Sequence, residues 1–288
     1  MHSIDIISDS PYRELYHDVP MGWGGKPGSP IPRPQPSDFV NYYFKNVKTD
    51  HENGESGFFI DVGANDGVIW SNTLGLETRE VPWTGICIEP HPDIFKELIK
   101  HKFVLLPYPT IRSSLEELQK AVTGLEMDTL GTVFTMLDGY AIYNYFGRAN
   151  SECLQVAISD KEGEADFLAF DGCWESNMLS GLVDKIDSKR QKEADFIKHR
   201  DTAKVKKVQC KKLQTILDER DITLVNYLSI DVEGSEISVL NSIDFDKVHF
   251  DLISVEANYS RKPIDKILKK NGYKFIEEVQ TDCFYKKS

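Results

Sequence analysis

Four acidic side chains, Asp61, Glu89, Asp231 and Glu256, each stand at or near the end of a short apolar run. Apolar runs of this length are typical of parallel strands, which are buried on both faces. Ligands of open α/β sheets bind outside the carboxyl ends of such strands. We therefore expect the four carboxylates to gather at one edge of a sheet, where they would favour a ligand that carries positive charge.

The first apolar run, 58–62, breaks into the turn Gly63-Ala-Asn-Asp-Gly67, whose glycines let the backbone turn sharply toward a ligand. A pyrophosphate cofactor would favour Gly-x-Gly-x-x-Gly and a helix N-terminus without acids, whereas Asp61 and Asp66 flank this turn. Two carboxylates repel phosphate, but they favour an ammonium and a sulfonium, which are the charged groups of S-adenosylmethionine (SAM). Glu89, at the end of the second predicted strand, is placed to accept both ribose hydroxyls.

The chain has 288 residues, which fit one α/β domain with insertions. Its 34 basic and 46 acidic residues give a net charge of −12, which argues against a binder of nucleic acid or of an anionic membrane. We expect a soluble, cytoplasmic protein, because the sequence has neither an apolar stretch of about eighteen residues nor the features of a signal peptide. The five cysteines form no Cys-x-x-Cys pair and are expected to fill the core.

Residues 1–36 are rich in proline and glycine, and we expect an extended arm ahead of a domain at 37–288. Helices are predicted at 68–77 and 92–101, which complete a βαβ unit with the first two strands. The segment at about 103–150 is longer than a crossover requires. We interpret it as an insertion that forms a lid, an oligomer contact or a satellite core.

The second half of the chain alternates between predicted strands and charged segments. Residues 153–159 and 165–170 have β character, and the lysine-rich stretch 204–212 reads as a strand with a solvated face. Residues 182–204 are charged and helix-prone, which indicates a surface segment. The chain ends in a predicted hairpin at 273–286, turned by Gln-Thr-Asp.

These runs, in this order, resemble the FkbM family of SAM-dependent methyltransferases over roughly residues 37–286. The resemblance implies the class I methyltransferase fold, a Rossmann-like α/β architecture with helices on both faces. Its seven-stranded sheet is mostly parallel, with an antiparallel strand supplied by the C-terminal hairpin. The matching stretches are Phe59–Gly67, Ser71–Leu74, Trp83–Pro92, Val156–Asp160 with Gly163, Leu228–Glu236 and Val255–Glu256.

The resemblance also implies roles for individual residues. Glu89 would bind the ribose of SAM, and Ser159 with Asp160 would lie near the adenine. Asp231 and Glu233 would face the transferring methyl group and the acceptor, so that Asp231 belongs to the cofactor site as well. The residues that would wrap the methionine part are Asp61, Gly63, Ala64, Asn65 and Gly67. Two departures from the family are the long stretch between Glu89 and Val156 and the proline-rich arm.

Methyl transfer is an in-line displacement at a sulfonium, and the enzyme must align the acceptor and accept its proton. A sugar hydroxyl has a pKa far above neutrality, so that a base or a metal is needed. Asp231 is the first candidate for the base, and Glu233, His91 and Glu256 are further candidates. In an alternative, Asp231, Glu233 and Glu256 hold Mg²⁺ through oxygen and lower the hydroxyl pKa. Each acid has a second interpretation as a cap of the turn that follows it.

The sequence therefore predicts a SAM-dependent methyltransferase that acts on a hydroxyl of a sugar, a glycan or another small molecule. A nicotinamide-dependent oxidoreductase is an alternative, disfavoured by the acid-flanked turn and the missing middle glycine. A SAM-fold protein that binds without catalysis is another, disfavoured because both Asp231 and Glu233 are present. The sequence indicates neither the acceptor, nor the choice between O- and N-methylation, nor the oligomeric state.

Overall fold

The computed structural model describes the chain in segments, and most of the predicted N-terminal arm and the centre of the predicted insertion lie outside them. None of the helices in these segments is long and apolar enough to cross a membrane. The described segments are residues 35–46, 56–67, 70–77, 82–107, 135–137, 140–146, 148, 150–170, 178–186, 189–192, 196, 199–258 and 260–288.

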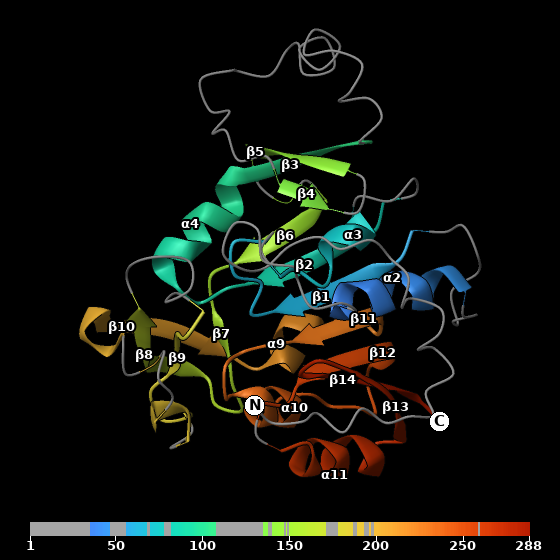
Figure 1. Cartoon of the computed structure of the whole chain (residues 1–288). Coiled ribbons are helices and arrows are strands. Elements are labelled where there is room, and N and C mark those ends of the chain that lie inside the picture. The colour runs from blue at the N-terminus through green and yellow to red at the C-terminus, as the bar shows by residue number, and fades with distance from the viewer. Residues whose placement is uncertain are drawn as a thin grey trace, which may run out of the picture.

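A seven-stranded sheet forms the centre of the molecule (Figure 1). Its strands are β1 (Phe58–Val62), β2 (Thr84–Ile88), β6 (Ser151–Leu154), β11 (Leu224–Ile230), β12 (His249–Glu256), β13 (Tyr273–Val279) and β14 (Asp282–Lys287). They lie in the order β13-β14-β12-β11-β1-β2-β6. All neighbours from β6 to β12 are parallel, whereas β14 is antiparallel to both β12 and β13. The predicted seven-stranded sheet with an antiparallel hairpin strand is confirmed.

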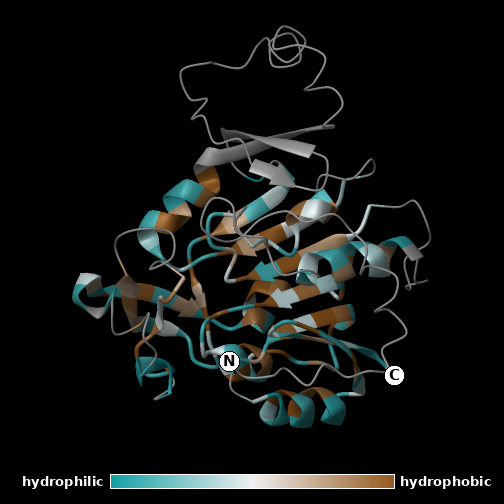
Figure 2. Ribbon diagram, viewed as in Figure 1, coloured by the Kyte–Doolittle hydropathy of each residue, from teal (hydrophilic) through white to brown (hydrophobic). Residues whose placement is uncertain are grey.

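The strands are buried on both faces, as their apolar composition predicts. Successive residues point to opposite faces, so that Ile60, Leu228 and Ile253 enter one apolar cluster. Phe59 and Tyr227 enter the other. Figure 2 shows the apolar residues concentrated in these strands. Because both faces are covered, the ends of the strands are the places where the sheet can present polar groups to a ligand.

Helices cover both faces of the sheet. Helices α9 (Leu213–Asp218), α10 (Glu236–Asn241) and α11 (Lys262–Lys270) contribute to the first cluster, and α2 (Pro36–Asn46), α3 (Leu74–Glu77) and α4 (Pro92–Lys100) to the second. Helix α2 is anchored by Phe39, whose ring lies 4.6 Å from that of Phe284. At its start, the Asp38 carboxylate accepts a hydrogen bond from the Gln35 N–H at 2.7 Å.

The predicted helix at 68–77 is shorter than expected. Within the described residues, a turn ends at Gly67 and helix α3 begins only at Leu74. The Ser71 hydroxyl accepts hydrogen bonds from the N–H groups of Thr73 and Leu74, so that a side chain rather than a preceding helical turn satisfies the start of α3. The 70–73 stretch is thereby free to face the sheet edge.

Two smaller sheets flank the central one. Strands β7 (Ala157–Ile158), β8 (Gly163–Phe170), β9 (Gly181–Leu182) and β10 (Ala203–Lys211) pair in the order β7-β10-β8-β9. Figure 1 places this sheet on the side toward which the arrowheads of β1, β2 and β11 point. Strands β3 (His101–Pro107), β5 (Tyr140–Phe146) and β4 (Thr135–Leu137) pair in that order within the predicted insertion.

The smaller sheets refine two predictions. The predicted strand 153–159 is divided, because β6 joins the central sheet whereas β7 pairs with β10. The predicted lysine-rich strand is confirmed as β10. The described part of 182–204 contains the short 3₁₀ turns Arg190–Lys192 and Arg200–Thr202, helical conformation at residues 196 and 199, and the start of β10. One residue of that segment, Arg190, is 4% exposed, so that the prediction of a surface segment is wrong at this position.

Candidate functional site

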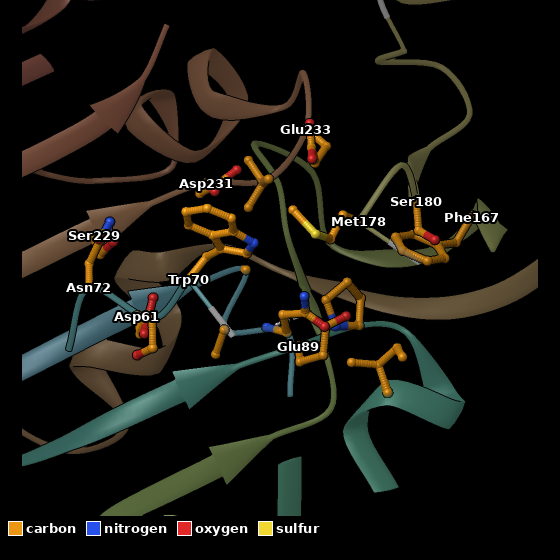
Figure 3. Close-up of a pocket in the computed structure, with 17 residues that line it drawn as sticks. Asp61, Trp70, Asn72, Glu89, Phe167, Met178, Ser180, Ser229, Asp231 and Glu233 are labelled. Atoms are coloured by element: carbon orange, nitrogen blue, oxygen red, sulfur yellow. Dashed lines mark hydrogen bonds between the residues drawn. The ribbon is translucent and has the colours of Figure 1, made fainter. Parts of the chain in front are cut away.

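A cavity of about 100 Å³ opens at the carboxyl edge of the central sheet (Figure 3). It lies where β1, β2 and β11 end, beside β8 of the smaller sheet. Its lining comprises Asp61, Gly63, Ala64, Asn65, Trp70, Ser71, Asn72, Glu89, Pro90, Ile94, Phe167, Met178, Ser180, Ser229, Asp231, Val232 and Glu233. The structure thus brings together most of the residues that the sequence singled out.

The glycine turn after β1 forms the floor of this cavity. The N–H groups of Gly63 and Ala64 both donate to the Ile88 carbonyl, at 2.9 and 3.0 Å, which ties the turn to the end of β2. Gly63 has φ +91°, and a Cβ there would overlap the carbonyl oxygen of Asp231. Position 63 therefore requires glycine for its backbone conformation and for the close approach of the β11 end.

Glu89 is held by two backbone groups. Its Oε2 accepts a hydrogen bond from the Asn65 N–H at 2.9 Å, and its Oε1 accepts one from the His91 N–H at 2.7 Å. Burial nevertheless raises the pKa of Glu89 to about 7, because the two hydrogen bonds offset only part of the lost hydration. Each carboxylate oxygen has a second lone pair, so that Glu89 can accept two further hydrogen bonds from a ligand.

Asp61 is oriented by a buried network that reaches Arg148. The Thr73 hydroxyl donates to Asp61 Oδ2 at 2.6 Å, and Arg148 Nη2 donates to the Thr73 oxygen at 2.9 Å. Arg148 also pairs with Glu77 at 2.5 Å and donates to the Gly67 carbonyl at 3.0 Å. Burial raises the pKa of Asp61 although Arg148 acts to lower it. One arginine thereby connects the turn after β1, helix α3 and the first acid of the site.

A second group of acids lies at the ends of β11 and β12. Asp231, Glu233 and Glu256 each place an oxygen within 4.8 Å of the other two. Burial, together with repulsion from Asp231, raises the pKa of Glu256 well above its ordinary value, and it raises the pKa of Glu233 although the Arg190 guanidinium acts to lower it. Arg190 forms an ion pair with Glu233. We call Asp231, Glu233 and Glu256 the acid cluster.

Asp282 was missed by the sequence analysis, which counted it in the turn of the final hairpin. Strand β14 is antiparallel, so that its first residue lies at the edge where the parallel strands end, and Asp282 is the register partner of Glu256. Asn72 from the cavity lining donates to Asp282 at 3.2 Å. Burial and the nearby Asp231 raise the pKa of Asp282 well above its ordinary value. The signal that could have found Asp282 is the antiparallel direction of the final strand.

Five of the predicted site residues, Gly67, His91, Ser159, Asp160 and Glu256, are not part of the lining described above, although Glu256 belongs to the acid cluster beside it. Gly67 packs away from the cavity, because a Cβ there would lie 2.6 Å from Leu98 and 3.2 Å from Arg148. Its role in this structure is to shape the turn.

His91 caps helix α4. Its Nδ1 accepts hydrogen bonds from the N–H groups of Asp93 and Ile94 at 3.2 and 3.4 Å, which assigns the ring proton to Nε2. The imidazole also packs edge-on against Phe167, with 6.0 Å between the ring centroids. These contacts give His91 a structural role at the start of helix α4.

Ser159 and Asp160 directly follow Ile158, which lines a second, smaller cavity whose walls are largely apolar and also include Val156. The Ser159 hydroxyl donates to Asp160, and Asp160 forms an ion pair with Lys185 at 3.4 Å. The smaller cavity shares the residues Gly63, Pro90, Phe167 and Val232 with the larger one. The expected contact of Ser159 and Asp160 with adenine stays a prediction.

Sequence reasoning also missed Trp70, Met178 and Ser180 in the lining. Trp70 is 41% exposed and has φ +60°, an uncommon backbone conformation for a bulky residue. In Figure 3 its indole lies between the carboxylates of Asp61 and Asp231, and Met178 and Ser180 approach from the side of the smaller sheet. Nothing in the local sequence signals these positions, because they depend on packing between segments that are distant along the chain.

The strand order, the antiparallel hairpin strand and the glycine turn at the sheet edge define a class I methyltransferase fold. Residues 61–275 match the methyltransferase FkbM domain, and the chain therefore belongs to the FkbM methyltransferase family. The crystal structure of an FkbM methyltransferase from Methylobacillus flagellatus KT is 11% identical, with a TM-score of 0.40 over 86% of this chain. This chain spans 50% of that protein's length. A comparison with curated proteins gives no match.

The substitution Gly63→Ala is expected to destabilise the fold by several kcal/mol, because it adds steric overlap to about 1 kcal/mol of backbone strain. Gly163→Ala is a matched control, since Gly163 also has a positive φ, +115°, but no heavy atom lies within 4 Å of its Cβ position. Urea unfolding of both variants measures the difference. Equal losses of stability would show that the approach of Asp231 to position 63 is not the constraint.

Proposed function

We propose that this chain is a SAM-dependent methyltransferase that transfers the methyl group to a hydroxyl of a sugar, a glycan or another small molecule. The observation that carries the proposal is the charge of the cavity. Asp61, Glu89, Asp231 and Glu233 all line it, and burial raises the pKa of each. A ligand with positive charge relieves that repulsion, whereas the pyrophosphate of a nicotinamide cofactor increases it.

The shape of the site supports one orientation of SAM. The ribose would lie on Glu89, whose two oxygens keep acceptor capacity, and the methionine part would lie over the turn at 63–65. The adenine would extend past Pro90 and Phe167 toward the smaller, apolar cavity. In this orientation the sulfonium faces Asp231, where positive charge is best compensated.

The acceptor would bind between Trp70 and the acid cluster. An exposed indole offers a flat apolar surface with a polar edge. The neighbouring carboxylates accept hydrogen bonds from hydroxyl groups. A sugar ring has an apolar face and a rim of hydroxyls, so that this combination suits it. Met178 and Ser180 would border the acceptor from the opposite side.

Asp231 is proposed as the base. The acceptor oxygen attacks the methyl carbon, the carbon–sulfur bond breaks, and its electron pair stays on sulfur, which becomes the neutral thioether of S-adenosylhomocysteine. The hydroxyl proton passes to Asp231. Asp231 Oδ1 is buried and has no hydrogen-bond partner among the described residues, so that it is available to take this proton.

The pH dependence of SAM binding tests the ribose contact. Because the pKa of Glu89 is about 7, the carboxylate that accepts the ribose hydroxyls is lost as the pH falls below 7. The dissociation constant measured by isothermal titration calorimetry is expected to rise by up to tenfold per pH unit there, that is by ~1.4 kcal/mol. Glu89→Gln should bind about tenfold more weakly at pH 8 and lose much of this dependence, whereas the surface variant Glu164→Gln should behave as wild type.

The same titration separates the alternatives. Wild-type binding by Glu89→Gln at pH 8 would contradict the ribose contact alone. Binding of NAD⁺ without binding of SAM would instead favour the nicotinamide-dependent oxidoreductase. Binding of SAM without turnover on any acceptor would favour a protein that binds but does not catalyse.

Asp231→Asn is expected to lower kcat by about 10²–10⁴-fold, because the amide cannot accept the proton, while SAM still binds. The assay uses methyl-labelled SAM and a panel of methyl glycosides, and it compares variants on the acceptor that the wild type methylates. The exposed Asp246→Asn serves as the control. A kcat within about twofold of wild type would remove Asp231 from the role of base.

A divalent cation in the acid cluster is the alternative to base catalysis. Asp231 Oδ1 and Glu256 Oε2 are buried without hydrogen-bond partners among the described residues, which suits a metal, but Glu233 is already paired with Arg190. We therefore propose base catalysis without a metal and expect activity to survive EDTA. Loss of activity in EDTA, together with a melting temperature that Mg²⁺ raises in wild type but not in Glu256→Gln, would establish the metal instead.

A further inference from the structure

Arg190 reaches the acid cluster from a distant part of the chain. It lies on the 3₁₀ turn Arg190–Lys192, outside the central sheet, yet it is only 4% exposed. One guanidinium nitrogen pairs with Glu233, and another donates to the carbonyl of Met178 at 3.3 Å. Both Met178 and Glu233 line the cavity. Arg190 therefore joins two of its walls.

The backbone supports the same placement. A Cβ at Gly181 would lie 3.4 Å from the Glu233 carbonyl oxygen, so that β9 packs directly on the turn after β11. Glu233 itself has φ +59° and is followed by Gly234 with φ +113°. This uncommon turn directs the Glu233 side chain toward the segment that carries Arg190.

Among the residues that the structure describes at this edge, the other charged groups are either anionic or paired elsewhere. Arg148 is paired with Glu77, and Lys185 with Asp160. The groups that interact electrostatically with the acid cluster from the surrounding elements are Arg190, Asp61 of β1, Glu89 after β2, Glu236 of α10 and Asp282 of β14. Within the described part of the chain, Arg190 is the cation that contacts the cluster.

We infer that Arg190 is a positioning residue for methyl transfer: it holds Glu233 as the anion of an ion pair and leaves Asp231, hydrogen-bonded to Glu256, as the group that takes the acceptor's proton. The inference rests on the proposed function. Three carboxyl groups within 4.8 Å cannot all ionise without a counter-charge. The Arg190 guanidinium is one positive charge, and it compensates the Glu233 carboxylate. A proton shared by Asp231 and Glu256 is the second positive charge.

The arrangement separates two roles among similar side chains. Glu233 is fixed and already neutralised, so that it accepts hydrogen bonds from the acceptor but not its proton. Asp231 keeps one oxygen toward Glu256, and its other oxygen has no hydrogen-bond partner within the described segments. Arg190 therefore determines that the acceptor's proton passes to Asp231 rather than to Glu233, although Arg190 need not touch the acceptor.

Two SAM analogues that differ at the reacting centre test this without knowledge of the acceptor. S-Adenosylhomocysteine has a neutral sulfur there, whereas sinefungin carries an ammonium group at the position of the transferred methyl. The ratio of their dissociation constants, followed by calorimetry from about pH 5 to pH 8, measures how far the acid cluster is ionised. Contacts to Glu89 and to the glycine turn are common to both ligands and cancel.

In the wild type, the preference for sinefungin should rise with pH as the cluster ionises. Arg190→Gln should move the midpoint of this rise upward by about one pH unit, which is about tenfold in the ratio near the midpoint, because the cluster then retains an extra proton. Arg190→Lys keeps the charge and should move it little. The double variant Arg190→Gln/Glu233→Gln removes both charges and should return the midpoint toward wild type.

A purely structural role for Arg190 would leave the midpoint unmoved and would not be rescued by the second substitution. Arg220→Gln is the control, because Arg220 forms its ion pairs with Glu152 and Glu219 away from the site. An unchanged midpoint in Arg190→Gln that still binds S-adenosylhomocysteine would overturn the inference while leaving the proposed function intact.

Two further outcomes are decisive. If Arg190→Gln does not fold, Glu233→Gln alone gives the answer, since Arg190 would then act wholly on Asp231 and Glu256 and lower the midpoint. A midpoint that stays or rises in Glu233→Gln overturns the inference. A wild-type protein that binds neither analogue would instead overturn the proposed function, and the inference with it.

Discussion

The structure depends on the burial of several carboxyl groups at one edge of a parallel sheet. Four neighbouring strands contribute the acids Asp61, Glu89, Asp231 and Glu256. The fold buries these carboxyl groups but places too few cationic side chains beside them to compensate their charge. In the proposed function, the remaining excess of buried acids makes the cavity favour a ligand with positive charge. A more stable protein would carry apolar or paired residues there, so the cost in stability is the counterpart of ligand recognition.

Two arginines limit that imbalance at two places with different results. Arg148 is enclosed with Glu77, Thr73 and the Gly67 carbonyl, and it fixes the backbone on which Asp61 stands. Arg190 contacts the acid cluster itself and so divides its members into a neutralised acid and one that is able to accept a proton. The first arginine sets geometry beneath the expected cofactor, and the second sets charge beneath the expected acceptor.

Much of this arrangement follows from local sequence. Apolar runs that end in acids predicted the strands and their common edge, because strand burial and chain direction are properties of short segments. The roles of Arg148, Arg190 and Asp282 could not be predicted in this way. Each depends on which distant segment packs beside the edge, and an arginine in a charged stretch has the same local pattern whether it is solvated or buried. Helix α3 is shorter than predicted for a related reason, since contacts of Ser71 and Thr73 replace its expected first turns.

Strand β14 inserts between β12 and β13, and its first residue receives a hydrogen bond from Asn72, 210 positions earlier. During translation, the parallel strands emerge from the ribosome well before the strand that must enter beside β12. The contact that supports Asn72 in the cavity lining is therefore assembled last, between residues of very large sequence separation. The site of a nascent chain is incomplete until β14 is in place. The protein is therefore able to bind its ligand only after the sheet is complete.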